Sequence, residues 1–203
     1  MNDFSLLADK ALVEETITAL QPRGITSFFV QTGQEAKAKV LELIPQGARV
    51  LASSSQTLEQ IGLTDEIDTS DKYVSVRKEY MALDHEKDKD KIRVSRSTPD
   101  FIVGSVHAIT IKGESLIASN TGSQLAGYVG GAGKVIWVVG VQKIVNSLDD
   151  GFKRVYDYVL PLESERLKKL YGVPSNVSKL LIYDKEIVPG RLTIVFVNEK
   201  LGF

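Results

Sequence analysis

Segments with helical periodicity alternate with short apolar segments in the N-terminal part of the chain, and this alternation limits the fold more than any other feature. In chain order we expect a helix at residues 4–20, a strand at 25–31, a helix at 35–44, a strand at 48–52 and a helix at 58–62. Pro22 and Gly24 end the first helix. This order is typical of a parallel sheet with crossover helices. The sequence therefore predicts an α/β fold, with an open, mostly parallel sheet and flanking helices.

The rest of the chain adds a charged segment and several further strands. Residues 71–98 carry many charges of both signs, and we expect them to form surface helices, in two segments. Strands are expected at 101–104, 107–111, 115–119, 134–141, 179–183 and 192–198, and helices at 122–129, 148–159 and 163–171. The strands on either side of Gly113 read as a hairpin, which suggests a mixed sheet edge or a small appended layer. Because no Ser/Gly-rich linker interrupts the pattern, residues 1–203 are interpreted as one α/β domain.

Charge and cysteine content exclude several classes of function. The formal net charge is −1, so no general field favours nucleic acid or an anionic membrane as a partner. Cysteine is absent, which excludes disulfides, a thiolate nucleophile and thiolate ligands for an iron–sulfur cluster. Residues 1–10 lack a signal-peptide pattern, and apolar runs such as 135–139 are too short to cross a bilayer. We therefore expect a soluble, cytoplasmic protein.

Polar side chains gather where the expected strands end, and open parallel α/β sheets bind ligands at such ends. The candidate ligand-binding residues are Ser53, Ser54, Ser55, Thr57, Ser105, Asn120, Thr121, Gly122, Ser123, Gln124 and Lys143. Hydroxyls, free amides at a helix start and a lysine ammonium all bind anions. Gly122 also lets the backbone approach a ligand closely. The sequence thus predicts an anion site at which two of these loops, residues 53–57 and 120–124, converge.

Each candidate also has a purely structural interpretation. The serines and threonines could cap helices, Lys143 could be a solvated residue at a strand end, and His107 could be a packed structural histidine. The glycines between residues 127 and 133 precede a strand, the wrong order for a dinucleotide loop, and read as a helix exit and turn. No Gly-x-Ser-x-Gly elbow and no metal-ligand spacing occurs. Neither a metal nor a cofactor is expected, and Glu114, Glu163 and Glu199 are unpaired candidate acids.

Several segments resemble the LUD domain, a family of lactate-utilisation proteins once called a domain of unknown function. The segments that carry the resemblance are 57–62, 106–110, 118–124, 138–145 and 198–203. The similarity covers nearly the whole chain and is to the stand-alone, cluster-free members, in agreement with the missing cysteines. The resemblance implies a fold like that of the superfamily of ribose-5-phosphate isomerase, glucosamine-6-phosphate deaminase and CoA transferases. It also implies a link to a multi-protein L-lactate oxidation pathway.

Two functions are consistent with these observations. The first is binding of a small anionic metabolite, such as a sugar phosphate, a carboxylate or a CoA-like group, at the strand-end loops. The second is a non-catalytic partner or regulatory subunit in L-lactate oxidation, which would contact other lactate-utilisation proteins. It is favoured by Ile111, because similar proteins commonly carry an acidic residue there, unless Glu114 substitutes for it. Whether the chain is an enzyme stays open, and a homodimer is expected only by analogy with such folds.

Overall fold

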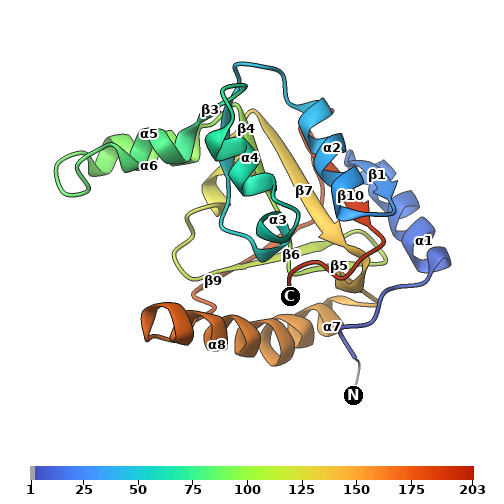
Figure 1. Ribbon diagram of the computed structural model, residues 1–203. Helices are drawn as coiled ribbons and strands as arrows, with labels where there is room; N and C mark the ends of the chain where they lie inside the picture. Colours follow the sequence, from blue (N-terminus) through green and yellow to red (C-terminus); the bar gives the residue numbers. More distant parts are fainter. Residues whose placement is uncertain (1–2) are drawn as a thin grey trace.

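A six-stranded parallel sheet forms the centre of the computed structural model, which describes residues 3–203 (Figure 1). Its strand order is β1 (Thr26–Val30), β10 (Leu192–Val197), β7 (Lys134–Gly140), β4 (Phe101–Gly104), β2 (Arg49–Ala52) and β3 (Val74–Ser75). All neighbouring strands in it run parallel. The predicted α/β class, with its mostly parallel sheet and flanking helices, is therefore confirmed.

A second, four-stranded sheet lies against one face of the first. Its order is β8 (Ile144–Val145), β5 (Ala108–Thr110), β6 (Ser115–Ser119) and β9 (Lys179–Tyr183). Strands β5 and β6 are the predicted antiparallel hairpin, and Gly113 at its turn has a φ of 94°, which favours glycine. The appended layer expected from the sequence is thus a sheet of its own, and the last strand, β10, belongs to the central sheet.

The central sheet is apolar on both faces because helices cover one face and the second sheet covers most of the other. Helices α2 (Gly33–Leu43), α3 (Gln56–Gln60) and α4 (Leu63–Thr69) pack on the first face, and α1 (Lys10–Leu20) packs on the second beside the small sheet. Along β7, Ile136 and Val138 point to the first face, and Val135 and Trp137 point to the other. Trp137 is fully buried, as expected for a core residue.

One long helix runs along the outer face of the small sheet (Figure 1). It consists of α7 (Leu148–Lys153), the π-helical segment η4 (Arg154–Val159) and α8 (Leu160–Tyr171). The two helices predicted at 148–159 and 163–171 are therefore one. Pro161 does not break this helix. It lies in the first turn of α8, directly after the π-helical segment, where the regular backbone bonding is already changed.

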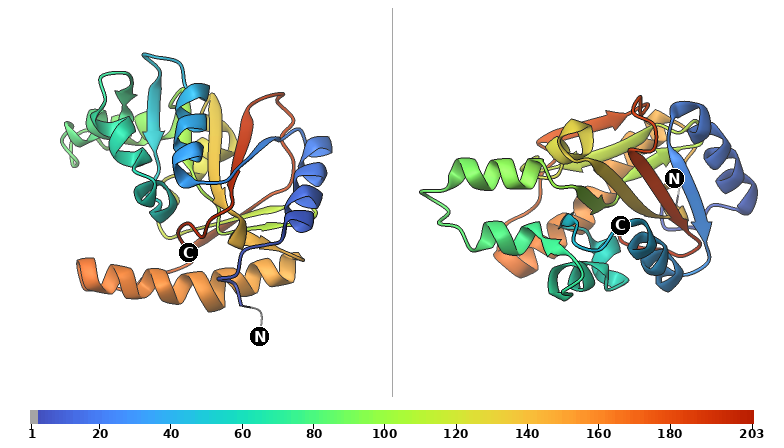
Figure 2. Two further views of the ribbon diagram at one scale, coloured as in Figure 1. Left: turned by 45° about the vertical axis from the view of Figure 1, so that its right-hand side comes forward. Right: turned by 90° about the horizontal axis from the view of Figure 1, so that it is seen from above.

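The charged segment 71–98 forms the predicted pair of helices, which project from the body as a hairpin (Figure 2). These helices are α5 (Val76–Met81) and α6 (Lys89–Ser97). The sequence interpretation missed α4 and the short edge strand β3, which precede them. No helix in residues 3–203 has the length and apolar character needed to span a membrane.

The helix predicted at 122–129 is wrong at its start. Ser119 Oγ accepts the Gly122 N–H (2.9 Å), and Thr121 Oγ1 accepts the Ser123 N–H (3.3 Å). Gly122 has a φ of 81°, which an α-helix does not contain. The start of the segment is therefore a turn, and helical structure starts at Leu125. It ends in the π-helical turn η2 (Gly127–Gly131), so the glycines lie at a helix exit as expected. The first helix also starts late, at Lys10, where Asp9 caps it.

Candidate functional site

A cavity of about 370 Å³ lies at the carboxyl edge of the central sheet, between that sheet, the small sheet and the long helix. The chain's last residues, Gly202 and Phe203, also line it, at the place where the C-terminus lies between α3 and the long helix (Figures 1 and 2). The sequence-predicted residues that line it are Ser53, Ser54, Ser55, Thr57, Ser105, Asn120, Thr121, Ser123, Gln124 and Lys143. Gly122 does not line it and faces a separate groove beside α6. The loops predicted to converge therefore do converge.

The loop after β2 contributes hydroxyls that are held by backbone carbonyls. Ser53 Oγ donates to Val103 O (3.0 Å) and lies 3.0 Å from Tyr128 Oη. Thr57, almost fully buried, donates to Leu201 O (3.2 Å). Ser55 is the N-cap residue of α3, but its side chain makes no capping hydrogen bond. The capping interpretation therefore does not account for Ser55.

Lys143 comes from the short 3-10 helix η3 (Val141–Lys143), directly after β7, and is 3% exposed. Its Nζ donates to Thr57 Oγ1 (2.9 Å) and Ser105 Oγ (3.0 Å), and within residues 3–203 it forms no ion pair. Burial, together with the nearby charge of Arg154, lowers the pKa of Lys143 well below its ordinary value. The alternative of a solvated lysine is therefore wrong.

Arg154 lies directly behind the cavity wall, in the π-helical segment, and is fully buried. Its Nη1 donates to the backbone oxygens of His107 and Phe203, and its guanidinium stacks 5.3 Å from the Tyr158 ring centroid. In the described part of the chain, its Nε and Nη2 atoms have no hydrogen-bond partner. Burial lowers the pKa of Arg154 to about 10, so the side chain remains charged at neutral pH.

His107 borders the cavity with one ring nitrogen fixed. Its Nδ1 accepts the Ala118 N–H (3.1 Å), so the neutral ring carries its proton on Nε2. Burial, followed by the charges of Lys143 and Arg154, lowers the pKa of His107 to about 3. The ring is therefore neutral at physiological pH. It is tied into the hairpin as a structural histidine would be, yet it also faces the site.

The long helix supplies residues that sequence reasoning did not place at the site. Arg166 and Glu163 line the cavity and form a two-bond ion pair, with both N···O distances 2.7 Å. Tyr128, from η2, also lines it, and burial raises the pKa of the Tyr128 hydroxyl to about 12. Glu163 is the single acidic side chain of the lining among the residues that the structure describes. Residues 3–203 contain no group of three or more acidic or histidine side chains that could hold a metal ion.

The family follows from comparison with known proteins. The family model described as the LUD domain matches residues 13–197. The chain belongs to the LUD domain family. Among solved structures, this LUD domain is similar to a DUF162 family protein from Deinococcus radiodurans, with 14% identity and a TM-score of 0.58. That alignment covers 95% of this chain and 100% of the other, and at this identity it concerns the fold alone. No curated protein matches the chain.

Ile111, where an acidic residue was expected by resemblance, lies outside the cavity of this LUD domain. It follows β5, and its N–H donates to Val145 O (2.9 Å) on the neighbouring strand β8. Glu114 does not replace it, because Glu114 pairs with Arg23 (3.3 Å) at the hairpin and is also absent from the lining. Glu199 accepts the Gly33 N–H instead (3.1 Å). Ile111 is therefore not one of the residues that line the cavity.

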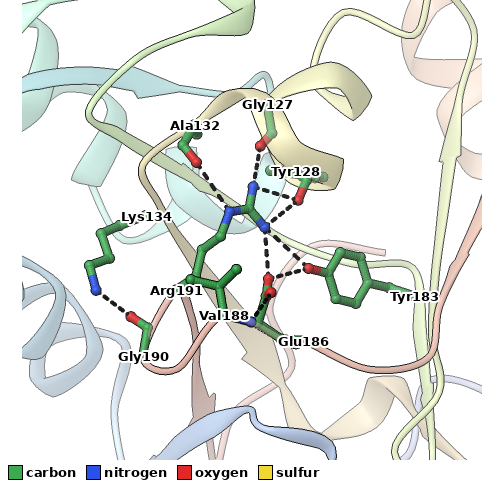
Figure 3. Close-up of polar contacts among 9 residues, drawn as sticks. All are labelled: Gly127, Tyr128, Ala132, Lys134, Tyr183, Glu186, Val188, Gly190 and Arg191. Carbon is green, nitrogen blue, oxygen red and sulfur yellow. Dashed lines mark hydrogen bonds and ion pairs between the residues drawn. The ribbon is translucent and has the colours of Figure 1, made fainter.

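A buried arginine holds the turn that brings Tyr128 into the LUD-domain site (Figure 3). Arg191 donates to the carbonyls of Gly127 (2.9 Å), Tyr128 (3.0 Å) and Ala132 (3.2 Å). Its charge is matched by Glu186 at 2.8 Å, and both side chains are buried. Gly127 O also accepts the Ala132 N–H (3.1 Å), so Arg191 adds side-chain donors to a turn that has its own backbone bond. The position of Tyr128 thus depends on a residue at the start of β10.

Proposed function

We propose that this LUD domain binds a small anionic metabolite in the cavity. The observation that carries the proposal is buried positive charge to which no Asp or Glu side chain among residues 3–203 is paired. Arg154 is fully buried, keeps Nε and Nη2 without a hydrogen-bond partner within residues 3–203, and donates through Nη1 to the backbone oxygens of His107 and Phe203. An uncompensated buried charge costs several kcal/mol, and a bound anion would supply the missing counter-charge.

The groups around the cavity suit such a ligand. Ser54, Ser55 and Thr121 bring hydroxyls, and Arg166 brings a second guanidinium whose charge is shared with Glu163. A cavity of about 370 Å³ is at the small end of ligand sites, so a sugar phosphate, a carboxylate or the end of a CoA-like group would fit. The family's link to lactate utilisation makes small carboxylates the first ligands to test. A role as a regulatory partner in L-lactate oxidation stays an alternative, but no residue of the cavity favours it.

The experiment is a thermal-shift and calorimetry series with inorganic phosphate, D-ribose 5-phosphate and L-lactate. A ligand present at 100 times its dissociation constant should stabilise the protein by about 2.7 kcal/mol. Replacing Thr121 and Ser123 together by Ala should weaken binding by about tenfold, in line with the loss of one or two hydrogen bonds. Thr18→Ala, on the exposed surface of α1, serves as the matched control and should leave binding unchanged.

Arg154→Met tests the carrying observation directly. This change removes the uncompensated charge and keeps apolar volume, so the free protein should be no less stable while anion-induced stabilisation is lost. If none of the three anions stabilises the wild-type protein, the proposal is wrong. If an anion binds Arg154→Met as tightly as wild type, the anion site lies elsewhere.

A further inference from the structure

We propose that Lys143 is an amine nucleophile that forms an imine with an aldehyde or ketone group of the anionic ligand. The ligand class would then be a small anion that also bears a carbonyl group. This inference rests on the proposed function, because it concerns the same cavity. It adds a covalent step that anion binding alone does not require.

The hydrogen bonds around Nζ match a neutral amine. Ser105 Oγ already donates its hydrogen to Val138 O (2.7 Å), and Thr57 Oγ1 donates to Leu201 O (3.2 Å). Both hydroxyls therefore act only as acceptors toward Lys143. A neutral amine has two N–H groups, which these two contacts satisfy, and one lone pair. An ammonium would have a third N–H with no acceptor among the described residues.

Lys143 is placed beside the cavity in which a ligand would bind. Lys143 borders the cavity, and no carboxylate among residues 3–203 pairs with it to stabilise the charged form. Burial and the charge of Arg154 lower its pKa well below the ordinary value, which agrees with the hydrogen bonds. A lysine that is desolvated next to another cation is the environment in which proteins use this side chain for imine chemistry.

The step balances without any other reagent. Nζ attacks the carbonyl carbon, a C–N bond forms, and the carbonyl oxygen takes up a proton to give a carbinolamine. The C–O bond then breaks, and the oxygen leaves as water with the two hydrogens that the amine has lost. His107, neutral with its proton on Nε2, borders the same cavity and is suited to donate a hydrogen bond to the carbonyl oxygen as it becomes a hydroxyl. The product is a neutral imine, and the ligand's anionic group would lie near Arg154.

The test is reductive trapping with glyoxylate, the smallest carbonyl-bearing carboxylate, and sodium cyanoborohydride at pH 7.4, followed by peptide mapping of the wild-type protein. Lys112, exposed at the hairpin turn, is the internal reference. An ordinary exposed lysine, with a pKa of about 10.4, has only about one amine in a thousand neutral at this pH. We expect Lys143 to be labelled at least about tenfold faster than Lys112, allowing for restricted access. Lys143→Arg should lose this adduct, and Lys112→Arg should keep it.

The outcomes separate the two proposals. Labelling of Lys143 no faster than that of Lys112 would overturn the imine proposal, whether or not phosphate stabilises the protein. Fast labelling that inorganic phosphate slows at Lys143 but not at Lys112 would support both proposals. Fast labelling that no anion affects would support the nucleophile and contradict the anion site. Because the labelling is mapped on the wild-type protein, the result does not depend on whether Lys143→Arg folds.

Discussion

Gly104 is the residue at which the packing of the cavity floor can be tested most sharply. A Cβ added at this position would lie 1.7 Å from Tyr128 Oη and 2.4 Å from Ser53 Oγ, far inside van der Waals contact. Gly104→Ala must therefore displace the tyrosine and break its hydrogen bond to Ser53. Overpacking costs about 1–3 kcal/mol and a lost hydrogen bond about 1 kcal/mol, so the free energy of unfolding should fall by about 2–4 kcal/mol.

The assay is urea denaturation at pH 7, with Gly130→Ala as the matched control. Gly130 lies in the neighbouring π-helical turn, and an added Cβ there meets nothing within 4 Å. This control should be neutral or stabilising by up to about 1 kcal/mol. Tyr128→Phe removes the hydroxyl that clashes, so it should cost less in the Gly104→Ala background than in wild type, with a coupling of at least about 1 kcal/mol. Equal effects of the two alanines, or strict additivity in the double mutant, would refute this account of the cavity floor.

Two further predictions concern buried charge and protonation. The pKa of His107 is about 3 in the fold and about 6.5 in the unfolded chain, so the fold favours the neutral ring and its contribution is complete above pH 6.5. That contribution to the free energy of unfolding should fall by about 1.4 kcal/mol per pH unit below 6.5. Between pH 7 and 4, the free energy of unfolding of His107→Gln should therefore depend less on pH than that of the wild type. Parallel profiles of the two proteins would contradict this prediction. Arg191→Met leaves Glu186 buried without its ion-pair partner and should lower the free energy of unfolding by about 3–5 kcal/mol, with Glu186→Gln in the same chain restoring part of the loss. The measurement is urea denaturation of both variants, and a double mutant no more stable than Arg191→Met would argue against the assigned role of the pair.

The sheet could be predicted from the sequence because its signals are local. Each strand of the central sheet longer than β3 is a short apolar run, and each joining segment carries its own Pro, Gly or polar stop. The two-residue strand β3 has no such signal, since it is defined by its pairing with β2. The turn at Gly122 was missed for a related reason. The hydroxyls of Ser119 and Thr121 compete with the helix for backbone amides, and residue type alone does not decide that competition.

One part of the candidate site could also be predicted from the sequence, and another part could not. The hydroxyl loops after β2 and β4 were predictable, because parallel strands place their carboxyl ends at one edge. Arg154 and Arg166 were not, since both lie on a helix whose polar residues look solvated in the sequence. Only the packing of that helix against the small sheet buries Arg154 and brings Arg166 to the cavity. That Ile111 would lie outside the cavity was not visible in the sequence, because its position depends on how the hairpin packs.

The π-helical segment η4 sets the rotational phase of the helix that follows it. Each residue of an α-helix advances the chain by about 100° around the axis. Deleting one residue within Arg154–Val159 would turn α8 by that amount relative to α7, and Glu163 and Arg166 would rotate out of the cavity wall. Neither charge would be lost, and the helix would stay unbroken. The composition of this wall is therefore governed by residue count along one helix, so a single insertion or deletion there would present a different set of side chains to the ligand.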